Sequence, residues 1–163
     1  MNSISKNIRD EVDKGLNLYI YSENTGNGKT SWALRLIQNY INSVWYDSSI
    51  TTRALYINVP RYLLAIKDAI GNVNEYADHI KNNVLNADLV IWDDIATKTI
   101  TEFESENLLS IINTRLDLGK SNIYTANIDP SDIQQSVGAR LTSRIIGKSK
   151  VIHFKGKDKR NIL

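Results

Sequence analysis

Short apolar runs alternate with longer stretches of helical periodicity along this chain. Five runs are short, apolar and rich in β-branched or aromatic residues, which is typical of buried strands. They cover residues 16–22, 53–59, 88–92, 121–126 and 150–154. Between them, apolar residues recur every three or four positions, which predicts helices. The predicted helices cover residues 29–42, 61–70, 75–85, 102–118 and 137–146.

Strands that alternate with helices predict an α/β fold in which the strands pair in parallel. We therefore expect an α/β sandwich built on a five-stranded sheet. A short amphipathic helix over residues 4–14, ended by Gly15, would precede it, and Asp129-Pro130-Ser131 would begin another short helix. Because functional sites of such folds lie at the carboxyl ends of the strands, the residues just after each strand matter most.

The segment after the first strand carries the most chemical information. Residues 25–31 read Thr-Gly-Asn-Gly-Lys-Thr-Ser. A strand, a glycine-rich turn, Lys-Thr and a helix form a phosphate-binding loop, whose backbone N–H groups and helix N-terminus face an anion. We expect Lys29 to reach the β- and γ-phosphates and the Thr30 hydroxyl to ligate Mg²⁺. The whole cradle would comprise Asn24, Thr25, Gly26, Asn27, Gly28, Lys29, Thr30 and Ser31.

Glu23 departs from the usual G-x-x-x-x-G-K-[ST] pattern, because it stands at the position of the first glycine. That position lies at the junction of strand and loop and mostly serves the turn. Gly26 and Gly28, which lie nearest the phosphates in such a loop, are present. We therefore expect nucleotide binding to survive the change.

Polar side chains follow the third and fourth strands. Asp93 and Asp94 come directly after a strongly apolar run. We expect Asp93 to hold Mg²⁺ opposite Thr30, directly or through water, and Asp94 to orient or activate the attacking water. Asn127 follows the fourth strand, where a neutral amide can contact the γ-phosphate or the water without adding repulsive charge.

Two arginines on the last predicted helix are candidates for a further role. Arg140 and Arg144 lie four residues apart, so they share a helix face. Phosphoryl transfer gains from a guanidinium that spreads over the developing charge. We favour Arg144 for this role over Arg140, and surface salt bridges are the alternative for both. If Arg144 comes from a neighbouring subunit, catalysis requires assembly.

Composition is that of an ordinary globular domain, with 163 residues of which 42% are hydrophobic and 23% charged. The chain has no cysteine, which excludes disulfides and cysteine-based metal or nucleophile chemistry. No apolar run approaches the ~20 residues of a membrane span, and the first residues lack the apolar core of a secretion signal. We therefore expect a cytoplasmic protein. Four large aromatics are expected to pack in the core or in connections rather than to form stacking platforms for bases: Trp32, Trp45, Trp92 and Tyr62.

The net charge of +2 is spread unevenly. From Lys148 onward, six Lys or Arg residues and one Asp give +5, so the rest of the chain carries −3. A basic tail can meet a phosphate backbone, and a solvated terminus is the plainer alternative.

Six segments together resemble one family. They are TGNGKTSWA, RALYINVPRYLLAIKDAI, ADLVIWDDIA, ENLLSIINTRLDLGKSNIYTAN, GARLTSRII and VIHFKGKDKR. In this order and spacing they resemble the AAA+ ATPase domain of bacterial and phage helicase loaders of the DnaC/DnaI type, with the transposition helper IstB as a close relative. The resemblance runs from about residue 15 to residue 160. It matches Asn127 to sensor 1 and Arg144 to the arginine finger, while Asp94 replaces the commoner Glu.

The resemblance implies one AAA+ domain over residues 1–163, a three-layer P-loop NTPase sandwich of the ASCE class with no C-terminal helical lid. Residues 1–15 would form an N-terminal helix or linker, and residues 148–163 the last strand and a basic tail. Loaders of this type usually carry an N-terminal domain that grips the helicase, and about 15 residues precede the first strand here. Either this is an excised ATPase domain, or the helicase is contacted differently.

The function implied is slow ATP hydrolysis that controls the placement of a DnaB-type replicative helicase on single-stranded DNA. ATP or ADP and Mg²⁺ would be the ligands, and self-association would bring Arg144 to a neighbour's nucleotide. Two alternatives stay open: an IstB-like transposition helper, and a nucleotide-gated protein-binding module with negligible turnover. A P-loop kinase for a small molecule fits Asn127 and Arg144 less well.

Overall fold

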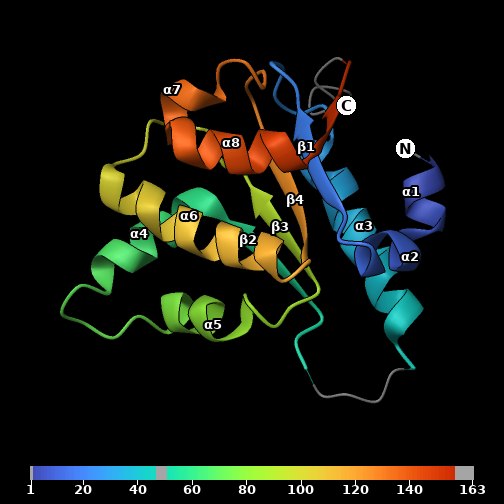
Figure 1. The fold of residues 1–163 in the computed structure, drawn as a ribbon, viewed down its shortest axis with the longest axis horizontal. Coiled ribbons are helices and arrows are strands. Elements are labelled where there is room, and N and C mark those ends of the chain that lie inside the picture. The colour runs from blue at the N-terminus through green and yellow to red at the C-terminus, as the bar shows by residue number, and fades with distance from the viewer. Residues whose placement is uncertain (1, 47–50, 157–163) are drawn as a thin grey trace, which may run out of the picture.

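Five parallel strands form a single sheet in the computed structural model, which describes residues 2–46 and 51–156 (Figure 1). The strands lie in the order β2-β3-β4-β1-β5, and each neighbouring pair is parallel. Their bounds are Asn17–Tyr21 (β1), Ala54–Asn58 (β2), Leu89–Asp93 (β3), Ser121–Ala126 (β4) and Lys150–His153 (β5). The predicted five-stranded parallel sheet is therefore confirmed. The predicted basic tail lies outside the described residues from residue 157 on.

Helices cover both faces of this sheet (Figure 1). One face carries α1 (Asn2–Lys6), α2 (Ile8–Asp13) and α3 (Lys29–Val44). The other carries α4 (Val59–Asp68), α5 (Glu75–Asn83), α6 (Glu102–Asp117), α7 (Ile133–Val137) and α8 (Ala139–Lys148). Successive strand residues point to opposite faces, so Leu18 and Ile20 pack in the core under α3, while Tyr19 packs in the core under the larger helical layer.

Three predicted helix boundaries differ from the structure. The helix expected over residues 4–14 is two helices, because Asn7 leaves helical geometry at φ −115° and ψ 29°. The helix expected to begin at Asp129 begins instead at Ile133. Gly138, at φ 85° and ψ 160°, separates α7 from α8, so the last helix does not begin at Val137. A left-handed φ of this kind suits glycine, and it turns the chain between two helices that a periodicity argument joins.

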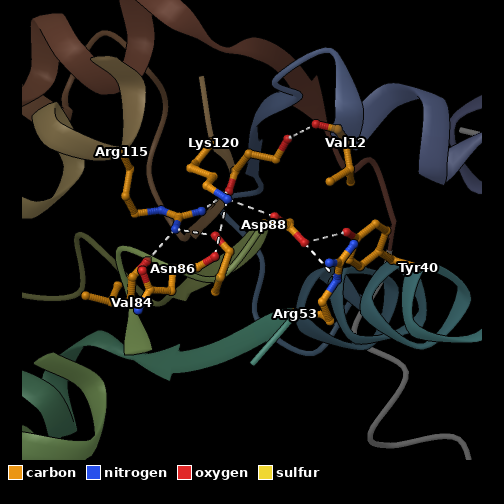
Figure 2. Close-up of polar contacts among 10 residues, drawn as sticks. Val12, Tyr40, Arg53, Val84, Asn86, Asp88, Arg115 and Lys120 are labelled. Atoms are coloured by element: carbon orange, nitrogen blue, oxygen red, sulfur yellow. Dashed lines mark hydrogen bonds and ion pairs between the residues drawn. The ribbon is translucent and has the colours of Figure 1, made fainter. Parts of the chain in front are cut away.

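A buried arginine holds the amino-terminal end of the sheet together (Figure 2). The Arg115 side chain is fully buried in α6, and burial lowers its pKa to about 10. Its guanidinium donates to four oxygens: the carbonyls of Val84, Ala87 and Ser121 and the side chain of Asn122. These bonds connect α6 with the end of α5, the start of β3 and the start of β4.

Asp88 forms a second polar centre beside the Arg115 clamp, as we call Arg115 and the four oxygens that it binds (Figure 2). Its carboxylate pairs with Lys120 at 2.8 Å and Arg53 at 2.9 Å, and it accepts a hydrogen bond from the Tyr40 hydroxyl at 3.0 Å. Burial alone would raise the pKa of Asp88, but hydrogen bonds from Lys120 and Tyr40 outweigh it and lower the pKa. The amino-terminal end of the sheet is thus closed by polar groups that satisfy one another.

We expect Arg115→Met to lower the free energy of unfolding by about 3 kcal/mol or more, because it leaves several buried acceptors without a donor. Urea unfolding followed by circular dichroism measures this. Arg140→Met is the matched control: Arg140 is exposed and its ion pair with Glu106 lies on the surface, so the change should stay below about 1 kcal/mol. Equal unfolding midpoints for the two variants would contradict the role of the clamp.

Candidate functional site

The loop between β1 and α3 is shaped as a phosphate-binding loop. β1 ends at Tyr21 and α3 begins at Lys29. Gly26 and Gly28 have φ of 71° and 94°, which place the backbone in the left-handed region. No side chain caps the start of α3 with a hydrogen bond, so the N-terminal turn of a long helix presents its N–H groups and the positive end of its dipole to the cavity.

Lys29 lies inside this loop and is 6% exposed. Its ammonium donates to the carbonyl of Asn24 at 3.1 Å, the side-chain oxygen of Asn27 at 3.3 Å and the carbonyl of Ser22 at 3.5 Å. A buried ammonium needs such partners because its desolvation is costly. The Lys29 ammonium is therefore held by oxygens of the loop, at the place where the oxygens of a bound phosphate would lie.

The Asp93 carboxylate, at the end of β3, accepts hydrogen bonds from three hydroxyl groups. Thr30 of α3 donates to Oδ1 at 2.8 Å, and Thr125 of β4 donates to the same oxygen at 2.5 Å. Tyr56 of β2 donates to Oδ2 at 2.7 Å. Thr30 and Asp93, which were predicted to lie on opposite sides of a magnesium ion, are thus in direct contact in the structure, and Asp93 is 3% exposed.

The oxygen ligands present here fit a magnesium ion. Mg²⁺ in proteins is usually held by one or two side-chain oxygens together with phosphates and waters. A hydroxyl and a carboxylate 2.8 Å apart, beside a phosphate-binding loop, supply such a pair. Among the described residues, no group of three or more His, Cys, Asp or Glu side chains could hold a metal ion alone.

Thr125 and Tyr56 are site residues that the sequence analysis missed. The Thr125 hydroxyl also accepts from the backbone N–H of Asp94 at 3.0 Å, so it positions both acidic residues. Burial and the hydrogen bond to Asp93 raise the pKa of Tyr56, which keeps its hydroxyl protonated as a donor at neutral pH. The sequence feature that could have identified Thr125 is its position, because it lies two residues before Asn127, near the end of its strand.

Asp94 adopts a left-handed backbone with φ of 59°. It is the one such non-glycine residue in the described part of the chain. Aspartate tolerates this region better than most residues, at a cost of order 1 kcal/mol. This turn, fixed by the bond from Asp94 N–H to Thr125, places Asp94 in the wall of the cavity beside the loop.

A cavity of about 730 Å³ brings together most of the residues predicted for the site, although Asp93 is not among those that line it. Its walls include Thr25, Gly26, Asn27, Gly28, Lys29, Thr30, Ser31, Asp94 and Asn127, and also Trp32, Arg35 and Phe154. Asn24 is exposed and is not among these lining residues; its side chain donates to the Gly156 carbonyl at 3.5 Å. Glu23 is exposed and likewise lies outside the lining, so it does not crowd the cradle.

The structure places the four large aromatics in three kinds of position: the core, the end of a helix and the wall of the cavity. Trp92 and Tyr62 are buried in the core as expected. Trp45 is 75% exposed at the end of α3. Trp32 lines the cavity, because it lies in the first turn of α3, next to the loop.

Arg144 lies away from the loop within one chain. It is exposed on α8 and lines a second cavity of about 670 Å³, between α6 and α8. Arg140 lines the same cavity, which confirms that the two arginines share a face, and it pairs with Glu106 at 2.8 Å. The structure therefore does not bring Arg144 to the cavity of its own phosphate loop.

No helix in the described residues has both the length and the apolar character to cross a membrane.

Known proteins resemble this chain over nearly its full length. The bacterial DnaA ATPase domain family matches residues 2–149. The replicative helicase loader DnaC of Escherichia coli K12 is 24% identical over 157 residues, which cover 94% of this chain and 61% of DnaC. The chain thus spans about three fifths of that curated relative.

Solved structures share the fold. DnaI superimposes with a TM-score of 0.75 at 18% identity, covering 98% of this chain and 82% of DnaI. The replication initiator DnaA bound to AMPPCP and single-stranded DNA superimposes with a TM-score of 0.69 at 21% identity, covering 96% of this chain and 46% of that one. The predicted resemblance to the DnaC/DnaI-type loaders is confirmed. Because the family match spans almost the whole chain, this protein belongs to the bacterial DnaA ATPase domain family of AAA+ proteins, among which it is similar to the helicase loaders.

Proposed function

We propose that this domain binds ATP with Mg²⁺, hydrolyses it slowly, and uses the nucleotide to control the placement of a replicative helicase on single-stranded DNA. The observation that carries the proposal is the contact of Thr30 with Asp93 at the edge of a cavity that the phosphate loop, Asp94 and Asn127 share. Family membership supports the nucleotide, and the similarity to DnaC supports the helicase as partner.

Each residue has a distinct task in this proposal. Lys29 exchanges its bonds to loop oxygens for bonds to the β- and γ-phosphates. Thr30 and Asp93 hold Mg²⁺, which when bound neutralises the charge that develops on the phosphates. Asp94 orients the attacking water, and Asn127 contacts the γ-phosphate or that water. The N–H groups of residues 25–31 face the remaining phosphate oxygens.

Arg144 of a neighbouring copy would complete the site. Arg144 lines the cavity between α6 and α8 and not the cavity of its own loop, which suits a group that acts on another subunit's nucleotide. Hydrolysis would then depend on self-association. Similarity to a DnaA that binds single-stranded DNA supports DNA as the scaffold for that assembly. A loader of this kind acts in the cytoplasm, where replication takes place.

A nucleotide-gated binding module with negligible turnover is the second candidate. The observation that favours it is Asp94, whose side chain is one methylene shorter than the glutamate common at this position. Hydrolysis kinetics decide between the two candidates. A transposition helper of the IstB type shares the same chemistry and differs in its partner.

Asp94→Asn should retain MgATP binding and lower the single-turnover hydrolysis rate at least a hundredfold, since asparagine tolerates the left-handed backbone but cannot accept a proton. Calorimetry and quenched-flow measurements separate the two effects. Asp132→Asn, at an exposed position that makes no cap hydrogen bond, is the matched control and should change neither. Lys29→Ala should abolish binding. A wild-type rate equal to that of Asp94→Asn would favour the binding module.

Arg144→Ala should remove the dependence of the ATPase rate on protein concentration and lower the assembled rate by 10³-fold or more, while leaving MgATP affinity unchanged. Arg140→Ala is the matched control on the same helix face. Mixing Arg144→Ala with Lys29→Ala protein provides a sharper readout, because each Lys29→Ala subunit donates an intact Arg144 to its neighbour and should restore activity. Fast turnover by a monomer that Arg144→Ala does not alter would refute the proposal.

A replicative helicase of the DnaB type should be retained by the immobilised protein in an ATP-dependent manner. Wild-type protein with ATP, with ADP and without nucleotide gives the comparison, and Lys29→Ala should behave as the nucleotide-free protein. Retention of a transposase in place of the helicase would assign the chain to the transposition helpers.

A further inference from the structure

We propose that Trp32 and Phe154 form the platform on which the nucleobase stacks, and that they supply much of the discrimination between a nucleotide and a bare polyphosphate. This inference rests on the proposed function, because it assumes that the phosphate chain occupies the loop. Both aromatic side chains line the loop cavity and both are partly buried.

The order of the strands gives the cavity two different ends. Asp94 follows β3 and Asn127 follows β4, whereas Phe154 follows β5 on the other side of β1. The phosphate loop follows β1 and lies between these two sides. A triphosphate whose reacting end points to Asp94 and Asn127 must therefore extend its nucleoside end toward β5, where the cavity wall is aromatic.

The two rings lie against each other at the end of β5. Their centroids are 5.6 Å apart and their planes are inclined by 49°. At this tilt the two rings do not fully cover each other's faces, and both residues line the cavity, so a planar partner can reach a ring face there. Arg35, about one turn further along α3, lines the same cavity.

The platform is fixed to the phosphate loop through the backbone. The Phe154 N–H donates to the Tyr21 carbonyl at 2.8 Å, and its carbonyl accepts from the Asn27 side chain at 3.2 Å. Trp32 N–H closes the first helical bond of α3 to the Gly28 carbonyl at 2.9 Å. The phosphate cradle and the aromatic platform are thus hydrogen-bonded to each other, so a base that stacks there meets a preorganised surface.

Calorimetry with two ligands, MgATP and magnesium tripolyphosphate, tests the inference. Trp32→Leu and Phe154→Leu preserve apolar packing but remove the ring face. Each should weaken MgATP binding about tenfold, as expected for the loss of one stacking contact, and leave tripolyphosphate binding within twofold. Trp45→Leu, an exposed tryptophan at the end of the same helix, is the matched control and should change neither affinity.

The outcomes distinguish the two proposals. Unchanged MgATP affinity in both leucine variants overturns the platform, because the base then lies elsewhere. A parallel loss of both ligands also overturns it, because the rings then only maintain the loop. If wild-type protein binds neither ligand, the proposed nucleotide function fails and the platform fails with it.

Discussion

The buried carboxylate of Asp93 connects four elements of this domain. Hydroxyl groups from β2, β4 and α3 donate to it at the end of β3. A carboxylate at 3% exposure is stable only when such donors replace the water it has lost. The positions of Tyr56, Thr30 and Thr125 are thereby fixed by hydrogen bonds to one carboxylate. The same contacts bring the helix that carries the phosphate loop against the strands that carry Asp94 and Asn127.

The two ends of the sheet use polar residues in opposite ways. At the amino-terminal end, Arg115 and Asp88 find their partners within the fold, and this end is closed. At the carboxyl-terminal end, Asp94 and Asn127 face a cavity. Because strands of a parallel sheet all end at the same edge, side chains distant in sequence meet there. The polar groups of the amino-terminal end therefore stabilise the fold, whereas those of the carboxyl-terminal end are accessible to a ligand in the cavity.

Sequence patterns predicted the parts of the site that are local. Lys29, Thr30 and Asp93 each follow a recognisable strand, and the strand pattern placed them at one edge. Tyr56 and Thr125 were missed because their role depends on which strands are neighbours, and strand order is not contained in hydrophobic periodicity. Trp32 was assigned to packing for a similar reason: its neighbour Phe154 lies 122 positions later, and only the pairing of β1 with β5 brings them together.

The charged groups of the site are satisfied by protein partners, and this constrains how the site can bind a ligand. Lys29 is held by loop oxygens and Asp93 by hydroxyl groups, so phosphate and metal must exchange existing hydrogen bonds rather than add new ones. Exchanging one hydrogen bond for another contributes less to the free energy of ligand binding than the same contact made by an unsatisfied group. Under the proposed function, contacts outside the cradle would then decide nucleotide affinity and hydrolysis rate. An aromatic platform at β5 would act on affinity, and an arginine from a neighbouring copy would act on rate, which leaves the cradle itself as a stable frame common to both.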